Sequence, residues 1–375
     1  MTSLATEDNS QPIKTDVLLI GAGPIGLEMA VALKDAEIDY IHVDARQIGH
    51  TISWFPRQAR FFSSPERIAI CGVPLLTVDQ SKATREEYLT YLLAVAQQFQ
   101  LQVQAYERVV ELRREGDQFS AVTERAGIMR RYVARRVISA IGDMHRPRPL
   151  ELPDTGPVPG SDLPHVSSYF DEPHPYVGQR LLIVGGRNSA VEAAVRCYRA
   201  GAKVAISYRR EQLDDSIKYW LKPEIEWLIQ TGAVEFHRSS VPVAIDRQTV
   251  TLARVDTSVE PMAVDRASAW QIPVDFVLLL IGYQMDTNLL SGAGVQLLPP
   301  NGRPELDPLT QQTNIPGLYV IGTAAAGSQL RYRLFIENCH SHVVRVLRHL
   351  TGRDPRHINP LAYSRLHEQP LAAES

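Results

Sequence analysis

Residues 16–26 read Asp-Val-Leu-Leu-Ile-Gly-Ala-Gly-Pro-Ile-Gly, and this stretch decides the fold. An apolar run of strand length meets a glycine-rich turn, and residues 27–33 continue it with a helical pattern. Gly21 permits the tight turn, Gly23 lets a pyrophosphate approach the backbone, and Gly26 lets the helix pack close to the strand. The N-terminus of that helix offers unpaired N–H groups to phosphate oxygens. The stretch therefore predicts the start of a dinucleotide-binding domain.

A second predicted strand, residues 40–43, ends at Asp44. An acid about 20 residues after the first glycine accepts hydrogen bonds from an adenosine ribose. The aromatic-rich segments 48–56 and 61–65 follow, past the carboxyl end of this strand, where the reactive ring of a dinucleotide lies. They predict a wall and lid for a flavin, and the alternative is a loop with its own small aromatic cluster. Residues 85–99 have the apolar spacing of an amphipathic helix.

Composition limits the classes of function. The 375 residues are enough for two domains, and 44% of them are hydrophobic. A formal net charge of −3 argues against nucleic acid as a partner. No apolar run approaches the ~18 residues that span a bilayer. Residues 1–14 are polar and are expected to form a disordered tail rather than a signal peptide, so we expect a cytoplasmic protein.

The chain has three cysteines, Cys71, Cys197 and Cys339, and no two form a C-x-x-C pair. A disulfide framework is therefore not expected. His340 and His342 are two residues apart and would diverge on a helix. We expect no metal site.

The opening pattern is repeated in the middle of the chain. Residues 179–184 predict a strand, Gly185-Gly186-Arg187-Asn188-Ser189 a second nucleotide turn, and residues 191–200 its helix. Residues 203–208 predict the next strand, which leads into Arg209-Arg210 where the first unit has an acid. Arginine binds a 2′-phosphate through a bidentate fork, whereas an acid would repel it. The first turn therefore suits FAD and the second NADPH. The alternative is that Arg209 and Arg210 are an ordinary surface pair beside Glu211, in which case the second turn would bind NADH.

Three predicted strands end on a glycine, one before the repeat and two after it. Residues 137–142 predict a buried strand that ends at Gly142, followed by a proline-rich crossover. Residues 273–283 and 313–323 predict buried strands with exit glycines Gly282 and Gly322, and residues 335–350 predict a final amphipathic helix.

These features together resemble the thioredoxin-reductase-like flavoproteins, and most closely the bacilliredoxin (bacillithiol-disulfide) reductase family. The stretches that carry the resemblance are Phe-Phe-Ser-Ser at 61–64, Val-Pro-Gly-Ser-Asp-Leu-Pro at 158–164, Gly-Gly-Arg-Asn-Ser at 185–189, Ser-Ile-Lys-Tyr-Trp at 216–220, Asn-Ile-Pro-Gly-Leu-Tyr-Val-Ile-Gly at 314–322 and Phe-Ile-Glu-Asn at 335–338. That family also carries a basic residue at the position of Arg187. The resemblance implies FAD, NADPH and a homodimer or homotetramer.

The predicted fold class is α/β, with two Rossmann-like dinucleotide-binding domains, the NADPH domain being inserted into an FAD domain that is split in sequence. We expect the FAD domain at residues 15–150 and 286–350, the NADPH domain at 151–285, and a C-terminal tail at 351–375. The predicted FAD contacts are Gly21, Gly23, Pro24, Ile25, Gly26, Asp44, Ala45, Trp54, Phe62, Val109, Gly142, Gly322, Thr323 and Ile336. The predicted NADPH contacts are Gly185, Gly186, Arg187, Asn188, Ser189, Tyr208, Arg209, Arg210, Lys218 and Gly282.

The chain departs from the resembling proteins at two positions. The wider superfamily follows its last exit glycine with an acid that binds the flavin, and Thr323 stands there instead. The bacilliredoxin-reductase branch carries a cysteine inside the first turn, and Ile25 stands there instead. Because a C-x-x-C pair is also missing, the catalytic residues stay unassigned. Cys71, Cys197 or Cys339 would serve only with a lowered pKa near the flavin.

The predicted activity is hydride transfer from NADPH to flavin and onward to an unidentified acceptor, a disulfide or another small-molecule or protein substrate of thiol redox chemistry. Two alternatives stay open. A flavin monooxygenase also uses paired nucleotide turns, although His165 lies five rather than four residues after Gly160 and the expected aromatic residue is missing. A redox-sensing flavoprotein with a partner protein and little turnover is the other.

Overall fold

The computed structural model describes the chain except for residues 1–5, 8–10, 331–332, 365 and 367–375. The chain divides into two compact units. The first comprises Met1–Ser53, Gln58–Arg146 and Tyr283–Ser375, and the second comprises Trp54–Arg57 and Pro147–Gly282. Each unit carries one of the two glycine turns at the end of a parallel strand.

The first unit is built on a mixed sheet with the order β4-β3-β2-β7-β6-β5, and β1 and β22 also pair with β7. Strands β2, β3, β4 and β22 run parallel to their neighbours, whereas β5, β6 and β7 form an antiparallel meander. The strands of the first unit are β1 (Thr6–Glu7), β2 (Ile13–Ile20), β3 (Tyr40–Val43), β4 (Val103–Gln104), β5 (Arg108–Glu115), β6 (Gln118–Arg125), β7 (Ile128–Ser139), β20 (Leu297–Leu298), β21 (Arg303–Pro304) and β22 (Leu318–Val320). Of these, β20 and β21 form a separate two-stranded sheet. Its helices are α1 (Pro24–Asp35), α2 (Pro65–Ile68), α3 (Arg85–Gln98), α6 (Asn288–Gly292), α7 (Ile336–Thr351) and α8 (Leu361–Ser364), with short 3₁₀ helices at His50–Trp54 and Gly322–Ala326.

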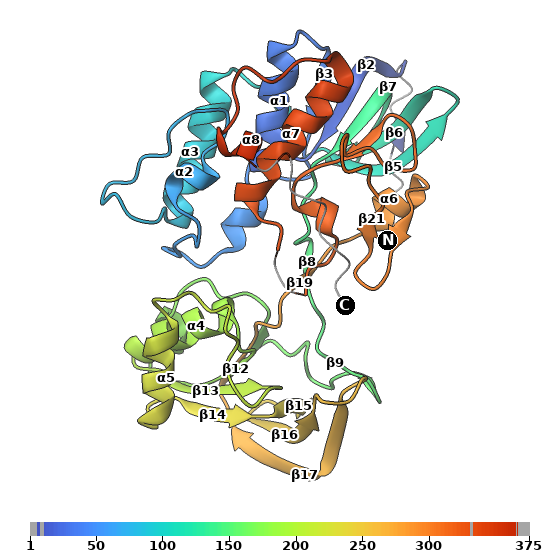
Figure 1. The fold of residues 1–375 in the computed structure, drawn as a ribbon. Coiled ribbons are helices and arrows are strands. Elements are labelled where there is room, and N and C mark those ends of the chain that lie inside the picture. Colours follow the sequence, from blue (N-terminus) through green and yellow to red (C-terminus); the bar gives the residue numbers. More distant parts are fainter. Residues whose placement is uncertain (1–5, 8–10, 331–332, 365, 367–375) are drawn as a thin grey trace. The chain divides into compact units, whose positions relative to one another are not determined.

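Side chains of β2 alternate between two cores, as the period of a strand requires. Val17 and Leu19 belong to a cluster with residues of α1 and α7, which lie side by side (Figure 1). Leu18 and Ile20 belong to a second cluster with residues of β5, β6 and α6. The sheet is thus covered on both faces, which is the condition under which a parallel sheet is stable.

The second unit repeats this plan with a five-stranded parallel sheet in the order β11-β18-β12-β13-β14. In Figure 1, α4 and α5 lie on one side of this sheet, and the antiparallel strands β15, β16 and β17 on the other. The elements are β9 (Glu151–Leu152), β10 (Gly156–Pro157), β11 (Val166–Ser167), β12 (Arg180–Val184), α4 (Asn188–Arg199), β13 (Lys203–Tyr208), α5 (Lys222–Gln230), β14 (Glu235–Arg238), β15 (Ser240–Ile245), β16 (Thr249–Asp256), β17 (Ala263–Pro273) and β18 (Phe276–Leu279). A 3₁₀ turn at His174–Tyr176 and the short strands β8 (Arg146–Pro147) and β19 (Tyr283–Gln284) complete the chain.

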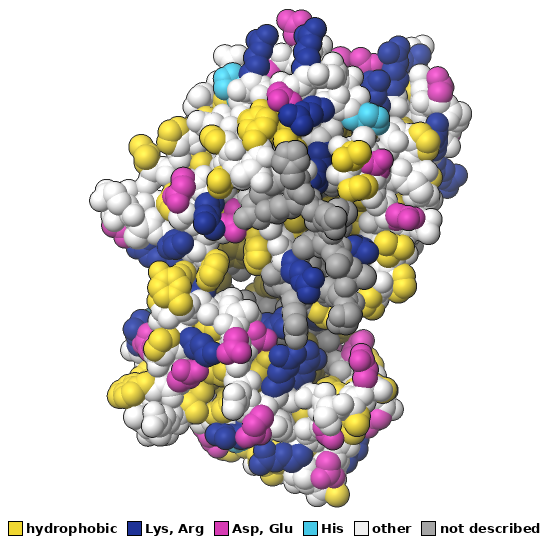
Figure 2. Space-filling model, in the orientation of Figure 1, with side chains coloured by type: hydrophobic (Ala, Val, Ile, Leu, Met, Phe, Trp, Pro, Cys, Tyr) yellow, Lys and Arg dark blue, Asp and Glu magenta, His cyan; other side chains and the backbone are white. Residues whose placement is uncertain are grey.

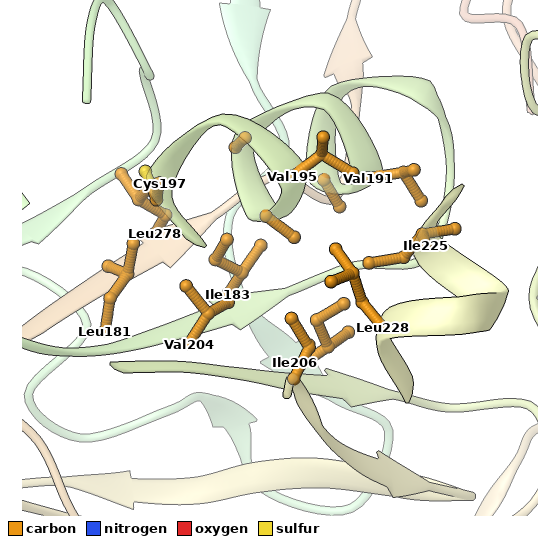
Figure 3. Packing of buried hydrophobic residues seen from close by; sticks show 14 of the residues in the cluster. Leu181, Ile183, Val191, Val195, Cys197, Val204, Ile206, Ile225, Leu228 and Leu278 are labelled. Carbon is orange, nitrogen blue, oxygen red and sulfur yellow. The ribbon is translucent and has the colours of Figure 1, made fainter. Parts of the chain in front are cut away.

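The core between β12, β13 and α4 contains Leu181, Ile183, Val191 and Ile206, all almost fully buried (Figure 3). Leu182 and Val184 point the other way, into a cluster with β15 and β16. Burial of such aliphatic side chains contributes about 1.5–3 kcal/mol each. These contacts hold the second glycine turn in place.

Three features differ from the sequence-based expectations. Residues 1–14 were expected to be a disordered tail, yet Thr6–Glu7 pairs with β7 and β2 already begins at Ile13; the rest of residues 1–10 lies outside the described residues. Trp54–Arg57 groups with the second unit. Within the expected C-terminal tail, residues 351–375, α8 contacts α7 and Asn359 is buried. The hydrophobic pattern of these short segments is too weak to signal their tertiary contacts.

A buried ion pair joins four separate segments of the first unit. Glu28 of α1 accepts a hydrogen bond from His340 of α7, with Oε2 and Nδ1 2.6 Å apart. Its other oxygen accepts the backbone N–H groups of Cys71 and Asn359. His340 Nε2 lies 3.0 Å from the carbonyl oxygen of Arg67. Because both imidazole nitrogens face acceptors, His340 is protonated.

Candidate functional site

The first glycine turn combines two closely packed glycines with an open one. Gly21 has φ +104°, and a Cβ there would lie 2.5 Å from the carbonyl oxygen of Ala140. A Cβ at Gly26 would lie 2.0 Å from the carbonyl oxygen of Gly21, so α1 packs directly on the turn. A Cβ at Gly23 would meet nothing within 4 Å. The space beside Gly23, at the N-terminus of α1 and before Pro24, fits the pyrophosphate of a dinucleotide.

Asp44, at the end of β3, is tied to this turn. Its Oδ2 accepts the N–H of Ala22 at 2.6 Å, and its Oδ1 accepts the N–H of Arg46 at 2.7 Å. Burial raises the pKa of Asp44, and these two N–H groups oppose that shift. A carboxylate has about four acceptor sites, so capacity for ribose hydroxyls is left. The predicted neighbour Ala45 is exposed.

His42, which was not among the predicted site residues, is hydrogen-bonded to the backbone of the first glycine turn. Its Nε2 lies 2.9 Å from the carbonyl oxygen of Gly21. Burial lowers the pKa of His42 to about 4, so the neutral ring donates its Nε2–H to that carbonyl. A polar residue inside an otherwise apolar strand was the signal available in the sequence.

The exits of β7 and β22 converge on the same edge of the sheet. The two strands pair in parallel, with Ser139 opposite Val320. A Cβ on Gly142 would lie 3.8 Å from Thr323 Oγ1, and a Cβ on Gly322 would lie 3.6 Å from the side chain of Ile25. Five of the predicted FAD residues, counting Gly21, therefore meet at the carboxyl ends of three parallel strands, where open α/β sheets bind ligands.

Four other predicted FAD residues are placed differently. Trp54 groups with the second unit and packs edge-to-face on Tyr169, with ring centroids 5.7 Å apart. Phe62 is 54% exposed. Val109 lies in β5, two residues after Glu107, whose N–H donates to the carbonyl oxygen of Asp44. Ile336 is the first residue of α7. A role for these four at the flavin stays a prediction.

The second glycine turn is closed by an aromatic ring. Gly185 has φ +139°, and a Cβ on Gly186 would lie 2.5 Å from the ring of Tyr208, so that ring rests directly on the turn. Asn188 Oδ1 accepts the N–H of Lys218 at 2.7 Å, which fixes the following loop against the start of α4. Ser189, in the first turn of α4, is exposed.

Three arginines gather beside this turn. Arg187 Nε and Arg210 Nη1 lie 3.1 and 3.4 Å from Asp214 Oδ2. Burial, followed by the nearby charges of Arg210 and Arg187, lowers the pKa of Arg209. Burial of Asp214 would raise its pKa, but hydrogen bonds from Ser216 and the charge of Arg187 outweigh burial and lower that pKa to about 2. Two guanidinium groups on one carboxylate, with the charge of Arg209 beside them, leave an excess of positive charge that fits a phosphate dianion.

The remaining members of the second site have defined partners. Glu211, which weakened the sequence-based interpretation, is bound by Arg238 at 3.2 Å and by the Ser239 hydroxyl at 3.0 Å. Lys218 Nζ forms an ion pair with Glu192 at 2.9 Å. Gly282, after β18, has φ +97°.

All three cysteines are buried and none is in a disulfide. Burial, with the charge of Glu28 as a second cause, raises the pKa of Cys71. Burial raises the pKa of Cys197 to about 12, and Figure 3 shows this side chain of α4 within the buried core cluster. Cys339 lies in the core between α1 and α7. Since the thiolate is the reactive form, the structure does not favour Cys71 or Cys197 as a nucleophile.

Among the described residues there is no group of three or more His, Cys, Asp and Glu side chains able to hold a metal ion. The helices described by the structure include none that is long and apolar enough to cross a membrane. Basic and acidic side chains are interspersed on the face that Figure 2 shows.

The fold and the paired glycine turns define a class of flavoproteins with two nucleotide-binding units. The chain belongs to the pyridine nucleotide-disulphide oxidoreductase family, whose model matches residues 18–322.

Individual relatives refine this assignment. The chain is 30% identical to the bacilliredoxin reductase Bdr of Bacillus subtilis over 331 residues, which is 88% of this chain and 95% of that protein. It superposes on the bacillithiol disulfide reductase Bdr (YpdA) from Bacillus cereus with a TM-score of 0.82 and 30% identity, covering 91% of this chain and 100% of the other. A ferredoxin–NADP reductase of Ignicoccus hospitalis is 25% identical over 313 residues, 82% of this chain and 89% of that protein.

The comparisons confirm the predicted family and the predicted enzyme class. The protein is an NADPH-dependent flavin oxidoreductase with FAD and NADPH as cofactors. The acceptor is not specified by the family.

Proposed function

We propose that this enzyme passes electrons from NADPH through FAD directly to its acceptor, without a cysteine relay in the protein. The observation that carries the proposal is the state of the three cysteines, all at most 1% exposed, with the pKa of Cys71 and Cys197 raised by burial. Ile25, apolar and 5% exposed, fills the position inside the first turn where the resembling branch has its thiol.

We assign FAD to the first unit and NADPH to the second. The open space at Gly23, the acceptor capacity of Asp44 and the glycine exits at Gly142 and Gly322 support the first assignment. The arginine cluster beside Gly186 supports the second. Bound FAD supplies the hydride-accepting ring, and the residues of the two units bind, orient and shield the cofactors.

The acceptor that we propose is a disulfide or a related thiol-redox compound, in line with the two relatives that are named for bacilliredoxin and bacillithiol disulfide. A ferredoxin-type carrier is the second candidate. Electron transfer to an iron–sulfur cluster needs no covalent intermediate with a protein thiol. Buried cysteines and the relative of that name favour this second candidate.

The proposal predicts resistance to thiol alkylation. The enzyme is first reduced with NADPH, then treated with N-ethylmaleimide and assayed with a panel of disulfides, a ferredoxin and a quinone. We expect activity to stay within about twofold of the untreated enzyme, because buried thiols of high pKa do not alkylate. Ile25→Cys, assayed in parallel, provides a chain with a thiol in the turn. If alkylation abolishes the activity of the unaltered enzyme, an internal thiol carries electrons and direct transfer is wrong.

A separate prediction concerns the choice of NADPH over NADH. Replacing Arg209 and Arg210 by leucine should raise the KM for NADPH about 10–100-fold, the loss of charged hydrogen bonds worth about 1.5–3 kcal/mol. The KM for NADH should change less than about threefold. Arg238→Leu, in the exposed arginine paired with Glu211, is the matched control and should leave both values unchanged. An equal rise in the KM for NADPH and for NADH would show that these arginines do not bind the 2′-phosphate.

The alternatives are distinguished by the fate of the flavin. A persistent C4a-peroxide spectrum after reduction and exposure to oxygen would indicate a monooxygenase, and failure of NADPH to bleach the flavin would indicate a redox sensor.

We further infer a homodimer or homotetramer that works in the cytoplasm, on the family resemblance and on cysteines that form no disulfide. Light scattering of the purified protein tests the oligomeric state.

A further inference from the structure

Asp143 is a buried acid that the sequence did not single out. It follows Gly142 directly, past the end of β7, and is 5% exposed. Its Oδ2 accepts a hydrogen bond from Gln329 Nε2 at 3.0 Å, and the Thr323 hydroxyl also donates to this carboxylate. After the neighbouring strand β22 the chain has Gly322 and Thr323. Of these two glycines that follow strand ends, Gly142 is therefore followed by an acid and Gly322 is not.

The carboxylate is held rigidly. Gln329 is itself 5% exposed, and its amide is fully engaged: Nε2 also donates to the carbonyl oxygen of Leu334, and Oε1 accepts the N–H groups of Arg333 and Leu334. A glutamine fixed at both ends of its amide has one orientation, so it presents its N–H to Asp143 in a fixed direction.

The carboxylate of Asp143 is surrounded mainly by hydrogen-bond donors. The groups that act on its pKa besides burial are the side chains of Gln329 and Thr323, its own backbone N–H and His145. The neighbour His145 accepts the N–H of Asp286 at Nδ1 and directs Nε2 at the carbonyl oxygen of Ile141. Burial of a carboxylate lowers the stability of the fold. Groups kept at such a disadvantage are concentrated at functional sites.

We propose that Asp143 is a cofactor-orienting residue, whose carboxylate accepts a hydrogen bond from a hydroxyl group of FAD at the carboxyl edge of β2, β7 and β22. Gln329, Thr323 and the backbone N–H of Asp143 itself fill three of its about four acceptor sites, which leaves acceptor capacity for a ligand hydroxyl. The proposal rests on the assignment of FAD to the first unit. It adds Asp143 to that site, so the acid follows the end of β7 rather than the end of β22.

The test is a comparison of cofactor affinity with apoprotein stability. Asp143→Asn keeps the shape and one acceptor oxygen but removes the charge. We expect the dissociation constant of FAD, from titration of the apoprotein, to rise about 10-fold or more, as for loss of a charge-assisted hydrogen bond. The midpoint potential of the flavin should rise, because a nearby negative charge disfavours the reduced anionic ring. The melting temperature of the apoprotein should stay the same or increase.

Three further variants decide the interpretation. Asp117→Asn, at the exposed turn between β5 and β6, is the matched control and should leave the affinity and the potential unchanged. Thr323→Val removes only the hydroxyl and should weaken FAD binding less than threefold. Exchange of the two side chains, Asp143→Thr with Thr323→Asp, should restore FAD affinity to within about threefold of the unaltered protein, and it provides the test if Asp143→Asn does not fold.

Some outcomes would overturn the proposal. A lower melting temperature of Asp143→Asn with unchanged FAD affinity and flavin potential would make Asp143 a structural residue. An effect of Thr323→Val as large as that of Asp143→Asn would make the hydroxyl the ligand instead. Affinity and potential are measured without an acceptor, so they leave the test of direct electron transfer unaffected.

Discussion

Gly23→Val is expected to remove FAD from the enzyme while leaving the first unit folded. Gly23 precedes α1 with φ −74° and ψ −179°, an extended conformation that any residue adopts, and a Cβ there meets nothing within 4 Å. The apoprotein should therefore lose less than about 1 kcal/mol of unfolding free energy. The same space is where the pyrophosphate approaches the backbone, so bulk there excludes the cofactor. The FAD content of the purified protein should fall below about a tenth of the normal value, more than 1.4 kcal/mol in affinity at the usual tenfold conversion.

Gly26→Ala is the matched control for this prediction, with the opposite expected result. Its Cβ would lie 2.0 Å from the carbonyl oxygen of Gly21, inside the contact between α1 and the turn. The variant should be destabilised by at least the upper end of the about 1–3 kcal/mol usual for overpacking. Urea unfolding of the apoproteins and flavin absorbance of the purified proteins separate the two cases. Full FAD occupancy in Gly23→Val would refute the assignment of the cofactor to this turn.

The regular parts of the fold were predictable because their signals are local. Residues 16–20, 40–43 and 203–208 are apolar runs of strand length, and the structure has β2, β3 and β13 there. The helix expected at 85–99 is α3, Arg85–Gln98. Glycine turns are visible for the same reason, since backbone geometry and close packing at Gly21 and Gly186 tolerate no side chain.

The parts of the site that were missed depend on contacts distant in sequence. Asp143 meets Gln329 across 186 positions, and Glu28 meets His340 across 312. Nothing in the spacing of either pair marks a partner. Trp54 reads as part of the first domain from its position after β3, yet its ring packs on Tyr169. Only the pattern of Gly142-Asp143 after a buried strand, compared with Gly322-Thr323, marked Asp143 in the sequence.

His340→Ala is expected to destabilise the first unit by about 3–5 kcal/mol, the usual loss when one partner of a buried ion pair is removed. Glu28 would then be fully buried without its cation, and the carbonyl oxygen of Arg67 would lose its donor. Equilibrium urea unfolding measures the loss. His349→Ala is the control on the same helix. Its exposed ring lies 3.1 Å from the Tyr319 hydroxyl and packs edge-to-face on that ring, so a loss of less than about 1 kcal/mol is expected.

The same ion pair predicts how stability depends on pH. Burial of His340 would lower its pKa, but the charge and hydrogen bond of Glu28 outweigh burial and raise that pKa above 6.5. A raised folded-state pKa contributes stability that is complete below the unfolded value and is lost as the pH rises through the folded value. The stability difference between the unaltered protein and His340→Gln should therefore be largest near pH 6 and shrink as the pH rises through the raised pKa of His340. A difference that grows with pH would mean that His340 is neutral in the fold.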